Sequence, residues 1–100
     1  NDPEHMISEM IEFDNTIKTV FDFIDNDDNT LVVITADHET GGTAITGGNL
    51  SKSKVKNEYV SGSHTATMVP VFSSGYKAHN FKGIYDNTKI FNKLFEIVNQ

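Results

Sequence analysis

The sequence of 100 residues contains no cysteine and no arginine, and both absences restrict its chemistry. Without cysteine, disulfides and thiolate metal sites are excluded, so a transition-metal site would need imidazole and carboxylate ligands. All eight basic residues are lysines. The chain therefore lacks the planar guanidinium group that usually grips phosphate or carboxylate through two parallel hydrogen bonds.

Positive charge and long hydrophobic runs are also scarce. The formal net charge is −6 and the pI is about 5.0, which argues against nucleic acid or an anionic membrane as the main partner. The longest apolar run is too short for a membrane-spanning segment. Hydrophobic residues make up 37% of the chain, a modest share for a self-sufficient core, and the sequence starts without Met or a signal-peptide pattern. We therefore expect a piece of a longer protein.

The first third of the chain predicts a helix. Asp2 can cap a helix start, and Pro3 suits the first helical position because its missing N–H costs little there. Apolar residues then recur every three or four positions, which predicts an amphipathic helix over 3–24. They are Met6, Met10, Phe13, Ile17, Val20, Phe21 and Ile24. The polar cluster at 25–30 ends the helix.

Residues 30–36 are apolar at consecutive positions, which indicates a strand covered on both faces, as in parallel sheets flanked by helices. The helix and this strand form half of a βαβ crossover. The unpaired strand edge would need the remainder of a longer chain, or would pair in a homodimer. The other expected elements are a surface excursion over 41–63 with a short strand at 43–45, a strand at 66–74, an extended piece at 81–85, and a helix capped at 86–88 that runs to about Val98.

Asp37 and His38 directly follow the most buried strand, and ligands bind at strand ends in parallel α/β sheets. A carboxylate oxygen and a neutral imidazole nitrogen suit Zn²⁺. Neighbouring side chains of a strand point to opposite faces, so both reach one ion only if the backbone turns, which Gly41-Gly42 would help. An ordinary loop, in which Asp37 caps a turn and His38 is solvated, remains an open alternative from the residues alone.

The other residues with reactive side chains give weaker signals. His64 precedes the second strand and gains interest only if the Asp37-His38 loop binds metal. His5 and His79 are expected at the surface. No serine lies in a strand-to-helix turn beside a base, so none is a credible nucleophile. The carboxylates at 25–28 lack the spacing and central glycine of an EF-hand loop.

Three stretches together resemble the C-terminal segment of alkaline phosphatases. They are VVITADHETGG at 32–42, GSHTATMVPVF at 62–72 and GIYDNTKIF at 83–91. The start of the chain is similar to the continuation of a Glu-Gly-x-x-Ile-Asp-x-x-x-His segment that precedes a helix in that family, so the resemblance covers residues 1–98. It implies an α/β fold in which residues 1–100 are a single C-terminal fragment of a larger catalytic domain. That domain is an α/β/α sandwich, of which this fragment would hold two helices and two to four short strands.

The resemblance also implies an activity, which is hydrolysis of phosphomonoesters through a phosphoserine intermediate at a two-zinc site with magnesium nearby. Asp37 and His38 match ligands of the zinc that holds the nucleophilic serine, and His64 matches a ligand of the other zinc. The serine, the phosphate-binding arginine and the magnesium ligands would lie outside this chain, so the chain alone is expected to be inactive. Glu39 and Thr40 are candidates for orienting His38. The family resemblance further implies a periplasmic, cell-envelope or secreted location.

Two alternatives remain. Cofactor-independent phosphoglycerate mutase, phosphopentomutase and nucleotide phosphodiesterases are similar at TADH and at HT…VP. They commonly place Gly directly after the Asp-His pair, whereas Glu39 follows it here, and YDNTKIF favours the phosphatase. The second alternative is a non-catalytic module that binds a partner or a single metal ion. The half-built crossover counts against it.

Overall fold

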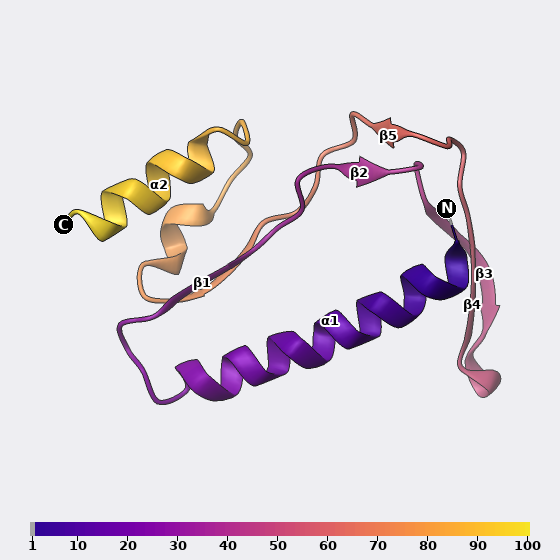
Figure 1. Cartoon of the computed structure of the whole chain (residues 1–100), viewed down its shortest axis with the longest axis horizontal. Coiled ribbons are helices and arrows are strands. Elements are labelled where there is room, and N and C mark those ends of the chain that lie inside the picture. Colours follow the sequence, from indigo (N-terminus) through magenta and orange to yellow (C-terminus); the bar gives the residue numbers. More distant parts are fainter. Residues whose placement is uncertain (1) are drawn as a thin grey trace. The chain divides into compact units, whose positions relative to one another are not determined.

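The computed structural model describes residues 2–100 and contains two α-helices, six short strands and two 3₁₀ turns in that range (Figure 1). This mixture agrees with the α/β expectation, although the strands number six instead of two to four. The chain divides into two compact units. The first unit combines the residues up to Phe21 with Ala36–Val69, and the second combines Asp22–Thr35 with Pro70–Gln100. Each unit is described separately.

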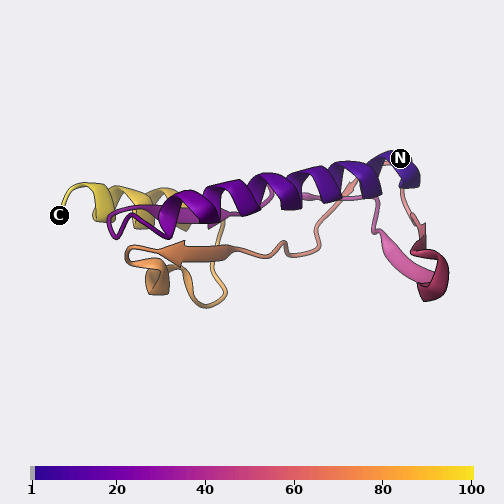
Figure 2. The same cartoon turned by 90° about the horizontal axis from the view of Figure 1, so that it is seen from below.

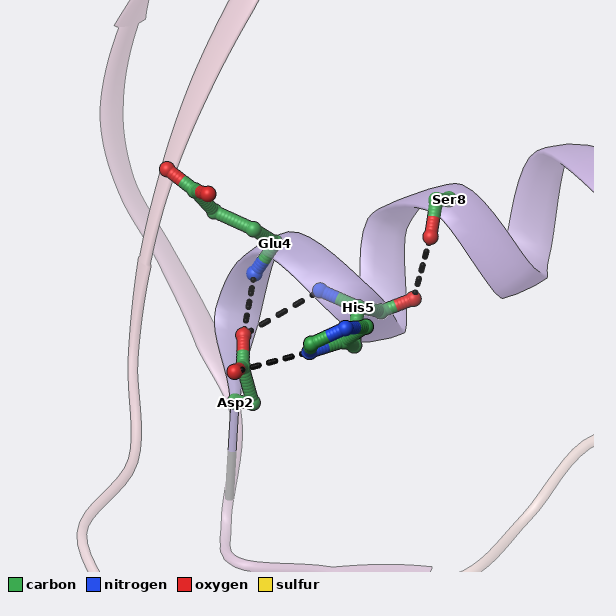
Figure 3. A network of polar contacts seen from close by, with 4 residues as sticks. All are labelled: Asp2, Glu4, His5 and Ser8. Carbon is green, nitrogen blue, oxygen red and sulfur yellow. Dashed lines mark hydrogen bonds and ion pairs between the residues drawn. The ribbon is translucent and has the colours of Figure 1, made fainter.

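Helix α1 spans Pro3–Ile24, as the apolar spacing predicts, and Figure 2 shows it as one continuous helix. Asp2 caps it. Its Oδ1 accepts hydrogen bonds from the backbone N–H groups of Glu4 at 3.0 Å and His5 at 3.1 Å, while its Oδ2 lies 2.8 Å from His5 Nδ1 (Figure 3). The side chain thus satisfies two of the N–H groups that every helix start leaves without an intrahelical partner.

The apolar stripe of α1 is mostly exposed among the described residues, with only Met6, Ile17 and Ile24 half-buried. No residue of α1 is buried, and side chains as large as Phe13 and Phe23 are 46% and 65% exposed. Most of the stability of a protein helix comes from packing its apolar face. The amphipathic pattern was therefore sufficient to predict the helix, although most of its apolar side chains are exposed among the described residues. Among residues 2–100, no helix combines the length and apolar character needed to cross a membrane.

The remainder of the first unit is two small antiparallel pairings. Strand β2 (Glu39–Thr40) pairs with β5 (His64–Thr65), and Figure 1 shows them side by side. Strand β3 (Ala44–Asn49) pairs with β4 (Lys54–Glu58) across the 3₁₀ turn η1 (Leu50–Lys52). This hairpin occupies most of the surface excursion expected at 41–63, where only a short strand was predicted. Its strands carry few alternating apolar residues, which is why the period-two signal of a strand is weak here.

In the second unit, β1 (Leu31–Ile34) pairs antiparallel with β6 (Phe72–Gly75). The expectation of parallel pairing for 30–36 is therefore wrong for the described residues, and all four residues of β1 are only half-buried. The strand expected at 66–74 begins later, because Pro70 has no N–H for a sheet hydrogen bond. Gly75, with φ +85°, ends β6, and a Cβ at that position would overlap the Thr30 backbone oxygen.

The C-terminal part of this unit packs around one aromatic ring. Phe81 ends the 3₁₀ turn η2 (Ala78–Phe81) and is only 3% exposed. The Tyr85 hydroxyl donates to the Phe81 carbonyl at 3.0 Å, and Lys93 Nζ donates to the Asn80 carbonyl at 2.6 Å while lying 4.6 Å from the centre of the Tyr85 ring. Lys93 belongs to α2 (Lys89–Val98), the predicted last helix. These contacts tie α2 to η2.

Helix α2 begins directly after 86–88, as predicted, although the Thr88 side chain makes no capping hydrogen bond to the helix. Asp86 Oδ1 accepts from the Thr88 backbone N–H at 3.0 Å and from the Thr88 hydroxyl at 2.7 Å. Thr88 hydrogen bonds lower the pKa of the Asp86 carboxyl, since they favour its charged form. The outer face of α2 is apolar and exposed at Phe91, Phe95 and Val98.

Candidate metal centre

Asp37 and His38 lie in a bend between β1 and β2, so the backbone leaves strand geometry where the sequence analysis required it. Asp37 Oδ1 accepts from the His38 backbone N–H at 3.0 Å, which orients the carboxylate. Its other oxygen, Oδ2, lies 3.4 Å from His38 Nε2. The two side chains therefore converge on one point instead of pointing to opposite faces.

The ring orientation of His38 selects the nitrogen that could bind a metal ion. Nδ1 lies 3.1 Å from the Glu39 backbone carbonyl and 3.4 Å from the Thr40 hydroxyl, and since a carbonyl can only accept, the contact with Glu39 forms when Nδ1 carries the proton. Nε2 then has the free lone pair. A backbone carbonyl on the far nitrogen is a common way to fix the tautomer of a metal-binding histidine.

His64 is brought directly to this bend. It pairs with Thr40 in the register of β2 and β5, and its ring stacks on that of His38 with the ring centres 3.4 Å apart and the planes 22° from parallel. His64 is thus part of the same cluster as Asp37 and His38, although 26 positions separate it from His38 in the sequence. His5 and His79 are exposed, as expected, and have no part in this contact.

Glu39 is the most extensively bonded side chain near the histidines. Its Oε2 accepts from the Gly42 backbone N–H at 3.0 Å and from the Thr65 hydroxyl, and its Oε1 accepts from the Thr43 backbone N–H at 3.1 Å. The hydrogen bond from Thr65 is the main reason that the pKa of the Glu39 carboxyl lies below its ordinary value. Glu39 therefore contacts His38 through its backbone carbonyl, while its carboxylate binds the glycine turn and β5.

The Gly41-Gly42 turn fixes the loop from the other side. Both glycines have positive φ, +79° and +57°, which a residue with a side chain adopts only with strain. The Gly41 N–H donates to the Ser63 carbonyl at 2.9 Å, and the Gly41 carbonyl accepts from the N–H groups of Val60 at 2.8 Å and Ser61 at 3.0 Å. A Cβ on Gly42 would overlap Val60 Cγ2. The turn thus joins the segment before His64 to the segment after His38.

The distances agree with zinc chemistry at part of a site. Two ligand atoms of a tetrahedral zinc, each about 2.0–2.2 Å from the ion, are about 3.4 Å apart. Asp37 Oδ2 and His38 Nε2 are 3.4 Å apart. Among residues 2–100, however, no group of three or more His, Cys, Asp or Glu side chains could hold a metal ion. The described residues therefore offer two converging ligands and a neighbouring imidazole, and a complete site needs further ligands.

One residue of this site, Thr65, is not marked by any local pattern in the sequence. Thr65 contacts the Glu39 carboxylate directly across the β2–β5 pairing, although 26 positions separate them. No such pattern exists because its role depends on a pairing of two-residue strands. The only sequence signal was its place beside His64.

Known proteins resemble this chain in both sequence and structure. A family model described as alkaline phosphatase matches residues 1–60. Alkaline phosphatase 3 of Bacillus subtilis is 49% identical over 45 residues, which is 45% of this chain and 10% of that protein.

Solved structures extend the similarity to nearly the whole chain. The alkaline phosphatase of the Antarctic bacterium TAB5 superposes with a TM-score of 0.87 at 38% identity, over 99% of this chain and 30% of that protein. A mutant of the TAB5 enzyme, with Mg bound in its M3 site, gives a TM-score of 0.87 at 35% identity over 99% of this chain and 31% of that one. The chain thus spans about a third or less of the relatives that it matches. With more than half of its residues matched by the family model, the chain belongs to the alkaline phosphatase family, which confirms the α/β fold class.

Proposed function

We propose that the protein hydrolyses phosphomonoesters through a phosphoserine intermediate at a two-zinc site, to which this chain contributes three ligands. Asp37 and His38 hold one zinc ion and His64 holds the other. The nucleophilic serine, the phosphate-binding arginine and the magnesium ligands belong to other parts of the protein. The hundred residues alone are inactive.

The observation that carries this proposal is the convergence of Asp37 Oδ2 and His38 Nε2 at 3.4 Å beside the stacked ring of His64. Two-metal sites that catalyse phosphoryl transfer hold their ions about 3.5–4 Å apart. Two imidazoles stacked 3.4 Å apart can serve two neighbouring ions at about this spacing. Family membership supports the phosphatase over the related mutases, phosphodiesterases and non-catalytic modules.

In this scheme the residues of this chain position charge and do not transfer protons. The Glu39 carbonyl keeps the proton on Nδ1 of His38, so Nε2 remains available as a ligand. One oxygen of the Asp37 carboxylate accepts a hydrogen bond from the His38 backbone N–H, and the other lies towards Nε2 of His38. Zinc, when bound, would lower the pKa of a coordinated hydroxyl or water and stabilise the charge that develops on the leaving oxygen.

The remainder of the phosphatase chain is the proposed partner of the two helices. Both helices expose apolar side chains, which include Met10 and Phe13 on α1 and Phe91 and Phe95 on α2. An exposed apolar face on a helix normally marks an interface. Because the matched relatives are about three times longer than this chain, their other segments are the natural cover for these faces. We further propose that the protein forms a homodimer and that it is periplasmic, in the cell envelope or secreted.

The test uses single variants of the full-length protein, assayed for hydrolysis of p-nitrophenyl phosphate and for bound zinc. Loss of a direct ligand should exceed the roughly 10–100-fold loss that follows removal of an outer partner of a metal ligand. We expect His38→Ala and His64→Ala each to reduce turnover by more than about 100-fold and to lower the zinc content. His79→Ala, which changes an exposed histidine outside the cluster, should retain both.

Two results would contradict the proposal. The first is full zinc content and turnover in His64→Ala or His38→Ala protein. The second is zinc-dependent turnover by the purified hundred-residue chain with a phosphoserine trapped in it, because that would place the nucleophile within these residues.

A further inference from the structure

We infer that Glu39 is a positioning residue that fixes the spacing between the rings of His38 and His64. Its carboxylate binds the hydroxyl of Thr65, the residue after His64, and Glu39 is itself the residue after His38. One side chain therefore links the neighbours of both histidines. The inference rests on the proposed function in so far as the two rings bind metal, but the link itself is a property of the metal-free chain.

The backbone pairing that brings the two rings together is short, and the hydrogen bonds of Gly41 to Ser63, Val60 and Ser61 lie beyond it in the glycine turn. Strands β2 and β5 pair over only two positions, Glu39 with Thr65 and Thr40 with His64. Even a complete two-stranded hairpin is marginally stable in water. The hydrogen bonds of Glu39 to Thr65, Gly42 and Thr43 add a side-chain brace to this short pairing.

The brace lies away from the metal-binding atoms. Side chains of an antiparallel pair that stand directly opposite each other share one face, and successive side chains alternate between faces. Glu39 and Thr65 therefore share one face, while Thr40 and His64 share the other with the stacked ring of His38. Glu39 can thus set the distance between the two imidazoles from the opposite face of the strand pair, where its carboxylate does not compete for the metal ion.

The brace requires a carboxylate specifically. Its two oxygens accept three hydrogen bonds from three donors. A glutamine offers one oxygen and one NH₂ group, and that NH₂ group would face a donor and leave it without an acceptor. On the other strand, Thr65→Val removes the hydroxyl at nearly constant shape, whereas Thr65→Ser keeps it. Together these changes separate the hydrogen bond from the packing around it.

The first measurement needs no metal. In metal-free full-length protein, ring-proton chemical shifts of His38 and His64 report their stacking, and hydrogen exchange at Gly42 and Thr43 reports the brace. We expect Glu39→Gln to change the ring shifts and to accelerate exchange at both amides. Thr65→Val should change the ring shifts in the same direction, and Thr65→Ser should resemble the parent protein.

The second measurement follows the metal. Zinc affinity, measured by competition with a chelator, should fall about 10–100-fold in Glu39→Gln and Thr65→Val protein, the range for outer partners of metal ligands. The visible spectrum of the Co²⁺-substituted protein should shift in both. Because the two side chains share one hydrogen bond, the double variant should bind zinc little more weakly than the poorer single variant. Thr65→Ser should keep the parent affinity and spectrum.

Specific outcomes overturn the inference. Unchanged ring shifts in metal-free Glu39→Gln protein overturn it regardless of what the histidines bind. Faster amide exchange with unchanged zinc affinity and cobalt spectrum also overturns it, since the brace would then be only structural. Thr65→Ser behaving like Thr65→Val assigns the effect to packing and likewise overturns it. If His38→Ala and His64→Ala retain their zinc, the proposed function fails, while the metal-free ring shifts still decide the role of Glu39.

Discussion

The loop that carries the histidines and the segment around Phe81 are held together by different kinds of contact. In the loop, the contacts are hydrogen bonds of the Glu39 carboxylate and the backbone of a two-glycine turn. Around Phe81, a ring that is only 3% exposed lies in η2, which contacts β1, β6 and α2. One region is defined by directional polar contacts, and the other by burial of an apolar side chain.

Apolar burial and hydrogen bonds contribute differently to the stability of a protein and to the geometry of a site. Buried apolar area supplies most of the free energy of folding but constrains geometry only loosely. Hydrogen bonds add a modest net free energy each but fix distances and directions. We therefore expect changes around Phe81 to alter stability and changes in the histidine loop to alter metal binding.

The largest expected effect on stability comes from Phe81→Ala in the full-length protein. Replacing a buried Phe by Ala removes apolar burial and leaves a cavity, at a cost of about 3–5 kcal/mol in the free energy of unfolding. Urea denaturation would measure that loss. Zinc stoichiometry under native conditions should be retained, because Phe81 and the histidines lie in separate compact units. Loss of zinc from protein that is still folded would contradict the division between the two regions.

An intermediate effect is expected from Gly42→Ala. The added Cβ would overlap Val60 Cγ2 at a residue whose φ is +57°, and backbone strain of this kind costs about 1–3 kcal/mol. The strain acts where the Gly42 N–H donates to Glu39, so zinc affinity should fall by a larger factor than in Phe81→Ala protein. Chelator competition and urea denaturation on the same samples would compare the two effects.

Gly62→Ala is the matched control, because a Cβ built there meets no atom within 4 Å apart from those of Gly62 and its two chain neighbours. It should leave zinc affinity unchanged. Equal losses in Gly42→Ala and Gly62→Ala protein would show that the loop does not depend on the shape of the glycine turn.

The smallest effect is expected at the exposed contact between Asp2 and His5, which lies outside both the histidine loop and the segment around Phe81. The hydrogen bond that His5 Nδ1 donates to the Asp2 carboxylate raises the pKa of His5 above its ordinary value of 6.5, and the same contact lowers the pKa of Asp2 below 3.8 (Figure 3). The His5 contribution to helix stability is present below pH 6.5 and is lost as the pH rises through the folded-state pKa. The Asp2 contribution is present above pH 3.8 and is lost as the pH falls through its lowered pKa.

Titration of the His5 ring protons by NMR would measure this contact. We expect a midpoint above 6.5 in the parent protein and a midpoint closer to 6.5 in Asp2→Asn protein. Glu9→Gln should lower the midpoint less, because Glu9 raises the pKa of His5 only through space. A midpoint that does not change in Asp2→Asn protein would show that this exposed pair is not formed in solution.

The sequence predicted both helices and the strand at 30–36, which is β1, but it did not predict how the strands pair. The apolar repeat and the Asp2-Pro3 start predicted α1 to the residue, and the 86–88 cap placed the start of α2. Both signals are local, since they depend on neighbours within one or two helical turns. Strand pairing is not local, so the antiparallel partner of β1 and the β3–β4 hairpin could not be predicted.

The candidate site divides in the same way. Asp37 and His38 could be predicted as candidate ligands because two residues with ligand side chains and the glycine turn that follows them are close together in the sequence. The association of His64 with them was expected only through the family resemblance, and the structure brings its ring to 3.4 Å from that of His38. The roles of Gly42 and Thr65 around Glu39 could not be predicted, because each hydrogen bond depends on the fold of the loop.

The sequence alone determined which residues are available as metal ligands, since the absence of cysteine leaves only imidazole and carboxylate for such a site. It also determined the two helices, whose periodic apolar faces are a local property of the chain. Only the tertiary structure decided which ligands meet. His64 is brought to His38 by three features: a pairing of two-residue strands, a glycine turn with positive φ, and a carboxylate that accepts from three donors. Each feature either joins residues that are distant in sequence or depends on a backbone geometry that the fold imposes.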